Sequence, residues 1–328
     1  MADTNKKDET LRRHTDLVPT LPSRENGGVT NKEVINDQNT LLTSSSLKGV
    51  MLVQQNFIAL PTDILLATYP KCGTTWLKAL IFAITNRSFF DFASHPLLTN
   101  NPHGCIPTLE GLVQNNNAST TLSLSSARLL ATHIPCHLLP ASVASSGCRI
   151  VYIFRNPKDV FVSWFHMKKL MTVKEEELPP LSLGVDIFCK RVNHFGSYWD
   201  HVLGYWNANS EFPGKVLILT YEDMKKDTFS CVKRLAEFLG QPFSSEEERD
   251  GVVEEIVKLC SFEHLSNLEV NKTGMLQFTA NSAIQNNVFF RKGEVGDWRN
   301  HLTDEMAARL NQISEDKFGG TGLMSHIN

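Results

Sequence analysis

Residues 63–76 read Asp-Ile-Leu-Leu-Ala-Thr-Tyr-Pro-Lys-Cys-Gly-Thr-Thr-Trp, and this stretch decides the fold class. Its first part, Asp63–Thr68, is an apolar run of the length typical of a buried strand. A turn with a proline and a glycine follows, and helical periodicity then runs over Thr75–Ile84. A strand, a glycine turn and a helix in succession aim backbone N–H groups and a helix N-terminus at one point, which favours an anion.

Four side chains or backbone positions in this turn fit an anion site. Gly73 lets the backbone approach closely, Thr74 and Thr75 bring hydroxyl donors, and Lys71 brings a full positive charge. The stretch does not contain the G-x-x-x-x-G-K-[ST] pattern of a Walker A loop. A simple Pro/Gly turn with an N-capping threonine is the structural alternative.

Three further apolar runs predict strands, namely Arg128–Thr132, Arg149–Phe154 and Lys215–Thr220. Their Leu/Ile/Val content shows no polar alternation, as expected of strands that are covered on both faces. Helical periodicity between them predicts an α/β fold, with a central parallel β-sheet flanked by helices in a single domain. Beyond Thr75–Ile84, the predicted helices are Pro157–Lys169, Asp186–Trp206, Phe229–Leu239 and Glu246–Leu259.

The remaining segments predict the domain boundaries and the loops. Residues 1–45 are polar and predict a flexible N-terminal arm, with the domain covering 46–328. Three stretches predict loops around a binding face: Ala93–Asn117, Met171–Leu183 and Asn267–Val288. The last of these is long for a loop, and loops of this length are usually lids, binding loops or disordered segments.

Composition bounds the class of protein. The 328 residues carry 32 Lys and Arg against 35 Asp and Glu, so a net charge of −3 argues against a general nucleic-acid binder or an anionic-membrane binder. The apolar run Leu77–Ile84 is interrupted by Lys78 and is too short to span a membrane. Seven cysteines without a C-x-x-C pair predict reduced thiols and no zinc site. A secretory signal is not evident, so we expect a cytoplasmic location.

The third predicted strand ends directly in Arg155, and a helix begins just after it. Asn156 can cap this helix, Pro157 suits its first position, and Asp159 sits where a capping box places an acid. Arg155 and Ser163, two turns further on, can serve a second anion that lies beside the first turns of the helix. A solvent-exposed arginine and an ordinary helical serine are the alternative.

Two other predicted strands also end in polar side chains. His133, followed by a proline in Thr-His-Ile-Pro, can act as a general base near neutral pH, although a structural histidine is the alternative. Tyr221 can stack or donate at the same crevice. Glu222 and Asp223 can ligate a metal or, as we expect, cap a helix. Open α/β sheets place ligands at the carboxyl ends of their strands.

Residues 290–298 read Phe-Arg-Lys-Gly-Glu-Val-Gly-Asp-Trp near the C-terminus. The adjacent cations Arg291 and Lys292, the glycines and the tryptophan predict an anion clamp on a loop, with an exposed basic turn as the alternative.

Together these motifs resemble the cytosolic sulfotransferase family from about residue 50 to residue 320. The family's 5′-phosphosulfate loop, T-Y-P-K-x-G-T-T-W, is matched by Thr68–Trp76 with Cys72 at the variable position. Tyr152–Ser163 resembles its 3′-phosphate motif, and Arg291–Trp298 meets its R-K-G-x-x-G-D-W clamp in full. The Thr-His-Ile-Pro context is closer to soluble plant members than to animal ones.

The resemblance implies 3′-phosphoadenosine 5′-phosphosulfate (PAPS) as donor, no metal, and a P-loop-like phosphosulfate loop. His133 would remove the acceptor's proton and Lys71 would stabilise the leaving phosphate. The donor-binding residues that it implies are Lys71, Cys72, Gly73, Thr74, Thr75, Trp76, Arg155, Ser163, Tyr221, Ser261, Phe262, Arg291, Lys292 and Gly293.

Two departures from the family pattern matter. Animal members commonly carry a lysine two residues before the catalytic histidine, but this chain has Ala131. Any equivalent help must then come from Lys71 or be absent. The family dimer motif K-x-x-x-T-V-x-x-x-E would fall at Arg299–Ala308, where only Thr303 matches fully, so a monomer is predicted.

The acceptor class stays open among flavonoids, steroids and hydroxy acids, as small hydroxylated molecules. The side chains that can line its pocket are Phe89, Phe90, Phe92, His137, Phe165 and Phe195, with core packing as the alternative for most. Two other functions compete: a Mg²⁺-dependent, nucleotide kinase-like phosphoryl transferase, with Asp223 as a metal ligand, and a catalytically silent PAPS-binding protein.

Overall fold

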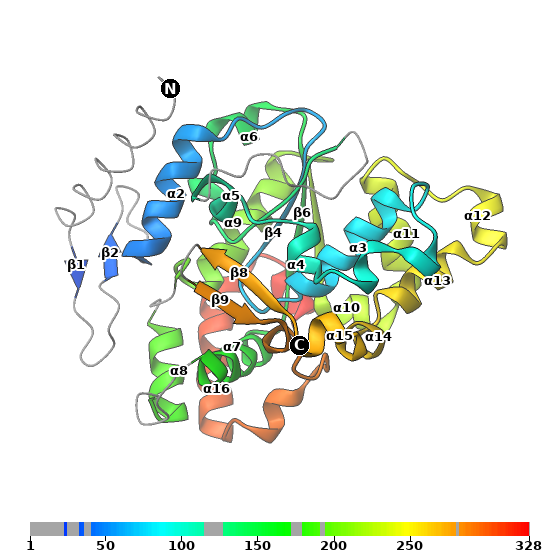
Figure 1. Cartoon of the computed structure of the whole chain (residues 1–328). Coiled ribbons are helices and arrows are strands. Elements are labelled where there is room, and N and C mark those ends of the chain that lie inside the picture. Colours follow the sequence, from blue (N-terminus) through cyan, green and yellow to red (C-terminus); the bar gives the residue numbers. More distant parts are fainter. Residues whose placement is uncertain are drawn as a thin grey trace.

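The computed structural model describes residues 23–24, 33–35, 41–114, 127–171, 179–190, 194–279 and 282–327. Its centre is a parallel sheet with the strand order β5-β4-β6-β7 (Figure 1). The strands are β4 (Ile64–Thr68), β5 (Leu129–Thr132), β6 (Arg149–Phe154) and β7 (Val216–Thr220). The four predicted strands and the predicted α/β class are therefore confirmed.

Both faces of this sheet are buried, as the unbroken apolar runs predicted. Along β6, Ile150, Tyr152 and Phe154 join one hydrophobic cluster, while Val151 and Ile153 join the cluster on the opposite face. This split follows from the two-residue period of a strand, which sends successive side chains to opposite faces.

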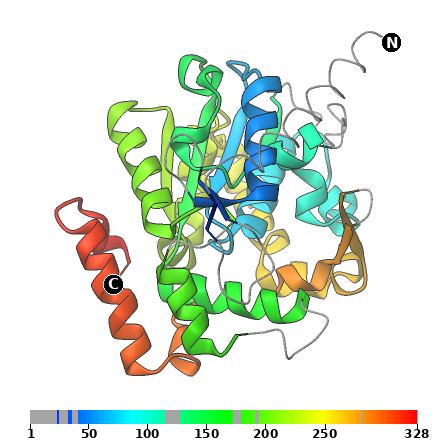
Figure 2. The same ribbon diagram turned by 90° about the vertical axis from the view of Figure 1, so that its left-hand side faces the viewer.

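Helices cover each face of the sheet (Figures 1 and 2). The cluster on one face includes side chains of α2 (Ser44–Asn56), α7 (Pro157–Met171), α8 (Leu181–Cys189), α9 (Tyr198–Glu211) and α16 (Asp304–Phe318). The cluster on the other face includes side chains of α3 (Thr74–Asn86), α10 (Tyr221–Lys226), α11 (Thr228–Phe238), α13 (Val252–Leu259) and α14 (Phe262–Asn267).

Two predictions of single helices are wrong, because each segment contains two helices with a positive-φ glycine between them. The segment predicted as Asp186–Trp206 is α8 and α9. Between them Gly196 has a φ of +81°, and the Ser197 side chain caps α9 by accepting from the Asp200 N–H. The segment predicted as Glu246–Leu259 is α12 (Ser245–Arg249) and α13, separated at Gly251 with a φ of +77°. A positive φ is incompatible with a continuing helix.

The predicted loops contain more regular structure than expected. Residues 93–117 include α4 (Pro102–Cys105) and α5 (Leu109–Gln114), while 115–117 lie outside the described residues. Of the loop predicted at 171–183, residues 172–178 lie outside the described residues, and α8 already begins at Leu181.

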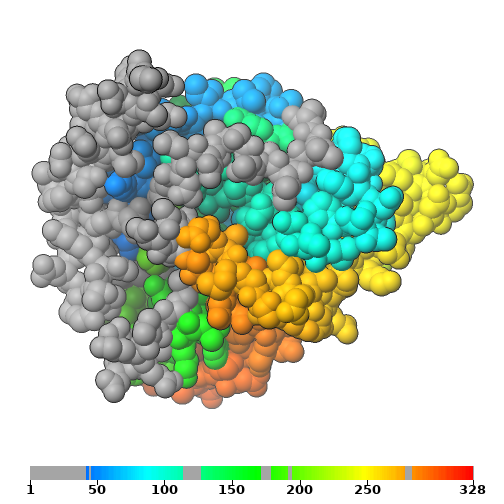
Figure 3. All heavy atoms as spheres, in the orientation of Figure 1, coloured from blue at the N-terminus to red at the C-terminus, as the bar shows by residue number. Residues whose placement is uncertain are grey.

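The predicted long loop at 267–288 is also wrong. It contains α15 (Glu269–Lys272), the antiparallel strands β8 (Met275–Thr279) and β9 (Ser282–Gln285), and the 3₁₀ turn η6 (Asn286–Phe289). The β8–β9 hairpin lies on the surface of the face shown in Figure 3, where it is orange. Its strands are too short and too exposed to give a clear apolar pattern.

Most of the predicted N-terminal arm lies outside the described residues. Three short strands within it, β1 (Ser23–Arg24), β2 (Glu33–Ile35) and β3 (Leu41–Thr43), form an antiparallel sheet. The domain boundary near residue 45 stays a prediction. None of the helices in the described ranges combines the length and the apolar character that crossing a membrane requires.

Candidate active site

A cavity of about 880 Å³ lies where the four parallel strands end. Because β4, β5, β6 and β7 run the same way, the residues that follow them meet at one edge of the sheet. Lys71, His133, Arg155 and Tyr221, one from each strand end, all line the cavity. The structure brings together every residue that the sequence predicted for donor binding or catalysis except Cys72.

The loop after β4 has an unusual backbone at the residue that carries the charge. Lys71 has a φ of +73° and is the one non-glycine residue with a positive φ in the described ranges. Such strain is retained where surrounding structure holds a functional group in place. Gly73 has a φ of +108°, and a Cβ there would lie 2.8 Å from Cδ2 of Tyr221, so no other residue fits. Burial, Arg291 and Arg155 lower the pKa of Lys71 to about 8.

His133 is held by one ring nitrogen, which leaves the other for chemistry. Its Nδ1 lies 2.7 Å from the Thr68 carbonyl oxygen and 3.1 Å from Thr68 Oγ1. A carbonyl oxygen only accepts, so Nδ1 carries the proton and Nε2 keeps its lone pair. Burial lowers the pKa of His133 to about 4. The imidazole is therefore neutral at pH 7 and in the tautomer that a general base needs.

Sequence reasoning missed a partly buried acid that supports this histidine. Oε1 of Glu110, in α5, accepts from the His133 backbone N–H at 2.9 Å and from Thr132 Oγ1 at 3.0 Å. Burial raises the pKa of Glu110. Glu110 lies in a segment that we predicted as a loop, and nothing in its local sequence pointed to His133, which is 23 residues away.

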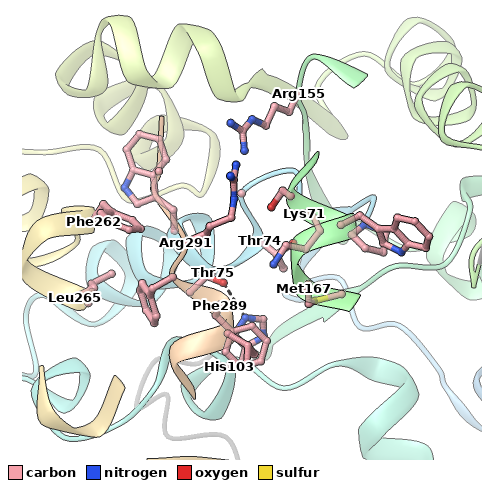
Figure 4. Close-up of a pocket in the computed structure, with 18 of the residues that line it drawn as sticks. Lys71, Thr74, Thr75, His103, Arg155, Met167, Phe262, Leu265, Phe289 and Arg291 are labelled. Atoms are coloured by element: carbon pink, nitrogen blue, oxygen red, sulfur yellow. Dashed lines mark hydrogen bonds between the residues drawn. The ribbon is translucent and has the colours of Figure 1, made fainter. Parts of the chain in front are cut away.

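Arg155 forms the second cationic wall of the cavity. Only 5% of it is exposed, its guanidinium lies 4.3 Å above the Tyr221 ring, and it pairs with Asp159 at 3.4 Å. Ser163, 8% exposed, lines the cavity from the next turns of α7, as an anion beside that helix requires. The Arg155 and Arg291 guanidinium groups point toward each other across the same space (Figure 4).

Asp159 ties α7 to the C-terminal clamp. Its carboxylate accepts from the backbone N–H of Gly296 at 2.7 Å and of Trp298 at 3.0 Å. The prediction that Asp159 forms a capping box is therefore wrong, because its oxygens are used by a segment 137 residues away. Asn156 does cap the helix, accepting from the Lys158 N–H at 3.0 Å.

A second buried acid organises the clamp itself. Asp297, 3% exposed, pairs with Arg291 and, at 2.7 Å, with Lys292. Although burial opposes its ionisation, hydrogen bonds from Lys292, Asn300 and Arg291 hold the pKa of Asp297 well below its usual range. The clamp cations are thus fixed in position before any ligand arrives.

Two buried donors in this wall have no protein partner in the described part of the chain, Nε of Arg155 and Nε of Arg291. Leaving a buried charged donor unpaired is costly, so such groups usually face a ligand. Both belong to residues that line the cavity, and an anion between them would satisfy both.

Aromatic rings also line the cavity, close to the cations. Trp76 packs edge-on against Tyr221, with ring centroids 5.6 Å apart. The ring centroids of Phe262 and Phe290 lie 6.2 Å apart. Ser261, the N-cap of α14, lines the cavity as well. A planar base can stack here.

A further part of the lining is apolar and comes from α7, the turn before α9, the hairpin and η6. Its side chains are Met167 and Leu170 of α7, Phe195 before α9, Met275 and Ile284 of the hairpin, and Val288 and Phe289 of η6. Of the side chains predicted to line the acceptor pocket, only Phe195 does. Phe89, Phe90, Phe92, His137 and Phe165 lie elsewhere. Phe90, for example, stacks on Phe82 with ring centroids 6.3 Å apart, in the hydrophobic cluster that includes the side chains of α3.

Cys72 and the two acids after β7 do not point into the cavity. The Cys72 side chain is fully buried in the core, so only its backbone can face a donor. Glu222 accepts from the Asn156 N–H at 2.9 Å, and Asp223 is exposed. No group of three or more His, Cys, Asp or Glu side chains that could hold a metal occurs among the residues described.

Residues 61–322 match the model of the sulfotransferase domain family. The chain belongs to this family and is a sulfotransferase. It is 48% identical to a flavonol 4′-sulfotransferase of Flaveria chlorifolia over 284 residues, covering 85% of this chain and 86% of that one. It is 46% identical to cytosolic sulfotransferase 12 of Arabidopsis thaliana over 320 residues, covering 96% and 95%. The predicted family and its plant-like character are confirmed.

Solved sulfotransferase structures share the fold. An Arabidopsis thaliana protein assigned as a steroid sulphotransferase is 39% identical, with a TM-score of 0.73 and 96% coverage of both chains. A mouse sulfotransferase complexed with PAP is 25% identical, with a TM-score of 0.65 over 88% of this chain and 95% of that one.

Asp159→Asn tests whether the α7 carboxylate holds the clamp. An amide has one acceptor oxygen, so either Gly296 or Trp298 loses its partner, and Arg155 loses its ion pair. We expect the free energy of unfolding to fall by about 3 kcal/mol, as when one member of a buried pair is removed. We also expect weaker binding of PAP, measured by calorimetry.

Asp223→Asn is the matched control, because this carboxylate is exposed and pairs only distantly with His326, at 4.0 Å. Stability and PAP affinity should stay as in the wild type. Equal behaviour of the two variants would contradict the role given to Asp159.

Proposed function

We propose that this sulfotransferase transfers a sulfuryl group from PAPS to a hydroxyl of a small acceptor. PAPS carries a phosphosulfate at one end of its ribose and a 3′-phosphate at the other. The observation that carries the proposal is that one cavity holds two cationic walls, Lys71 at one and Arg155 with Arg291 at the other. The PAP bound by the mouse relative is the molecule that PAPS becomes on losing its sulfuryl group.

The residues present fit each part of this donor. Lys71, Gly73, Thr74 and Thr75 would hold the 5′-phosphosulfate, with the Cys72 backbone between them. The 3′-phosphate would pair with Arg155, Ser163, Arg291, Lys292 and the Gly293 N–H, which would satisfy the two unpaired guanidinium donors. Trp76 would stack on the adenine, next to Ser261, Phe262 and Tyr221.

The catalytic step needs one base and one cation at this site. Nε2 of His133 removes the acceptor's hydroxyl proton as the acceptor oxygen attacks sulfur. The new sulfur–oxygen bond forms while the bond between sulfur and the 5′-phosphate oxygen breaks, and the electron pair stays on that phosphate. Lys71 stabilises the charge that develops there. A sulfuryl group carries less charge than a phosphoryl group, so lysine and backbone donors are enough without Mg²⁺.

The competing readings fit the geometry less well. Asp223, the acid that a Mg²⁺-dependent phosphoryl transferase would use, is exposed and does not line the cavity. A silent PAPS-binding protein would not need His133 in the basic tautomer or the strained Lys71 backbone.

The apolar walls between α7 and the hairpin suit flat, mainly apolar acceptors. Flavonoids and steroids fit this lining better than hydroxy acids do, in line with the flavonol-specific Flaveria relative. We propose a cytosolic location, as the name of the Arabidopsis relative states for that protein. We also propose a monomer: Thr303, the one full match to the dimer motif, serves as the N-cap of α16.

The direct test is transfer of labelled sulfate from PAPS to a panel of phenols, steroids and hydroxy acids in the presence of EDTA. Labelled product under EDTA supports metal-independent sulfuryl transfer, and the best acceptor names the substrate class. Product that requires added Mg²⁺ would contradict the mechanism, and failure to bind PAPS would contradict the function.

His133→Ala tests the assigned base. A positioned base contributes about 10²–10⁴-fold to a rate, so we expect kcat to fall by that factor while PAP affinity stays nearly unchanged. His137→Ala is the control, since this exposed histidine does not line the cavity. A His133→Ala protein that loses PAP binding as well would show a structural role instead.

The pH dependence of kcat/KM should be bell-shaped. His133 must be neutral, so activity should fall as the pH drops through about 4. Lys71 must be charged, so activity should fall as the pH rises through about 8. Lys71→Arg should move the basic limb upward, because arginine does not titrate in this range. A basic limb that stays in place would assign it to another group.

A further inference from the structure

Lys78 is a buried cation behind the phosphosulfate loop. None of its surface is exposed, although it lies in α3 among apolar neighbours. Its Nζ donates to the Ile106 carbonyl oxygen at 2.7 Å and lies 3.2 Å from Nδ1 of His103. Burying a lysine costs free energy unless its donors are hydrogen-bonded, so a buried lysine at this position suggests a specific role.

His103 connects this lysine to the loop. Its Nε2 lies 2.9 Å from Oγ1 of Thr75, and its ring stacks on Phe289 with centroids 4.1 Å apart (Figure 4). Burial, and then the nearby charges of Lys78 and Lys71, hold the pKa of His103 well below its usual range. The ring is therefore neutral, with one nitrogen that accepts and one that donates.

The donor and acceptor in each hydrogen bond from Lys78 through His103 to Thr75 follow from the chemistry of Lys78. Burial lowers the pKa of Lys78 to about 7, although Glu110 opposes the shift. In its charged form, the Nζ of Lys78 can only donate, so Nδ1 of His103 accepts and the ring proton sits on Nε2. Nε2–H then donates to Oγ1 of Thr75. The Thr75 hydroxyl hydrogen must point elsewhere, and no acceptor for it occurs among the described residues. Thr75 lines the cavity, so its hydrogen is free for a ligand there.

We propose that Lys78 is a positioning residue that acts through His103 to orient and polarise the Thr75 hydroxyl toward the phosphosulfate of the donor. This inference rests on the proposed function. Each bond in the chain strengthens the next, because hydrogen bonds in a low-dielectric interior polarise one another. The Thr75 hydroxyl thus becomes a better donor to the oxygen on which negative charge builds up.

The surroundings of Lys78 match this role. Glu110 and Cys105 are the other titratable groups that act on it, and Glu110 also holds His133. Ala131 of the neighbouring strand β5 supplies no charge to the transfer site. Lys78 therefore adds a buried cation that is linked through His103 to the lining of the donor-binding cavity.

A double-mutant cycle tests the chain. The enzymes are the wild type, Lys78→Met, Thr75→Ala and the double variant, compared by kcat for sulfate transfer at saturating PAPS. A hydrogen bond assisted by a charge accounts for about a 10- to 100-fold effect, so Lys78→Met should lower kcat by that factor with little change in the KM for PAPS. In the Thr75→Ala background, Lys78→Met should cause almost no further loss.

Two further variants separate this role from a structural one. Lys215→Met is the control, because the Nζ of Lys215, like that of Lys78, donates to backbone carbonyl oxygens (of Ala144 and Ser146), but Lys215 precedes β7 at the end of the sheet opposite the cavity. It should leave kcat unchanged. His103→Asn removes the imidazole that connects Lys78 to Thr75. If the Lys78→Met protein does not fold, His103→Asn takes its place in the double-mutant cycle.

Equal losses from Lys78→Met with and without the Thr75 hydroxyl would overturn the proposal, as would an unchanged kcat. A wild-type enzyme that binds PAP but transfers no sulfate would instead contradict the proposed function, and the relay with it.

Discussion

Every strand of the central sheet runs in the same direction, and the site depends on this constraint. Parallel strands end at a common edge, so residues far apart in sequence follow them into one cavity. Lys71 and His133 leave the two neighbouring strands β4 and β5, while Arg155 and Tyr221 leave β6 and β7. The helices on both faces bury the sheet, which fixes the spacing of these side chains. Two cationic walls and a neutral imidazole thus face a shared space.

The charges in this space are balanced by buried acids at its rim. Asp159 and Asp297 hold Arg155, Arg291 and Lys292, and Asp159 also fixes the backbone of the C-terminal clamp. The acids and the Glu294 carbonyl oxygen use only some of the guanidinium donors, and Nε of Arg155 and Nε of Arg291 have no partner among the described residues. Such preorganisation lowers the cost of ordering the site at the moment of reaction. It also explains how a chain with a net charge of −3 can bind a highly anionic donor.

The sequence allowed the four strands to be predicted from their apolar runs. Its contiguous motifs also pointed to residues that, apart from Cys72, line the cavity of the candidate site. The predictions that were wrong concern features that depend on backbone geometry or on contacts between residues far apart in sequence. Gly196, just before the N-cap of α9, and Gly251, between α12 and α13, both have a positive φ inside segments that the sequence predicted as single helices. The hairpin within 267–288 is too exposed to show an alternating pattern. Lys78 was visible only as an interruption of an apolar run, since its partner His103 is 25 residues away.

A crystal structure of the protein with bound PAP would test the central claim most directly, namely that the two cationic walls bind the two ends of one nucleotide. The account predicts the 3′-phosphate between Arg155, Ser163 and Arg291, with the two unpaired Nε donors now bonded. It predicts the 5′-phosphate at Lys71 and Thr75. A 3′-phosphate bound outside this wall, with the guanidinium donors still unpaired, would contradict the account.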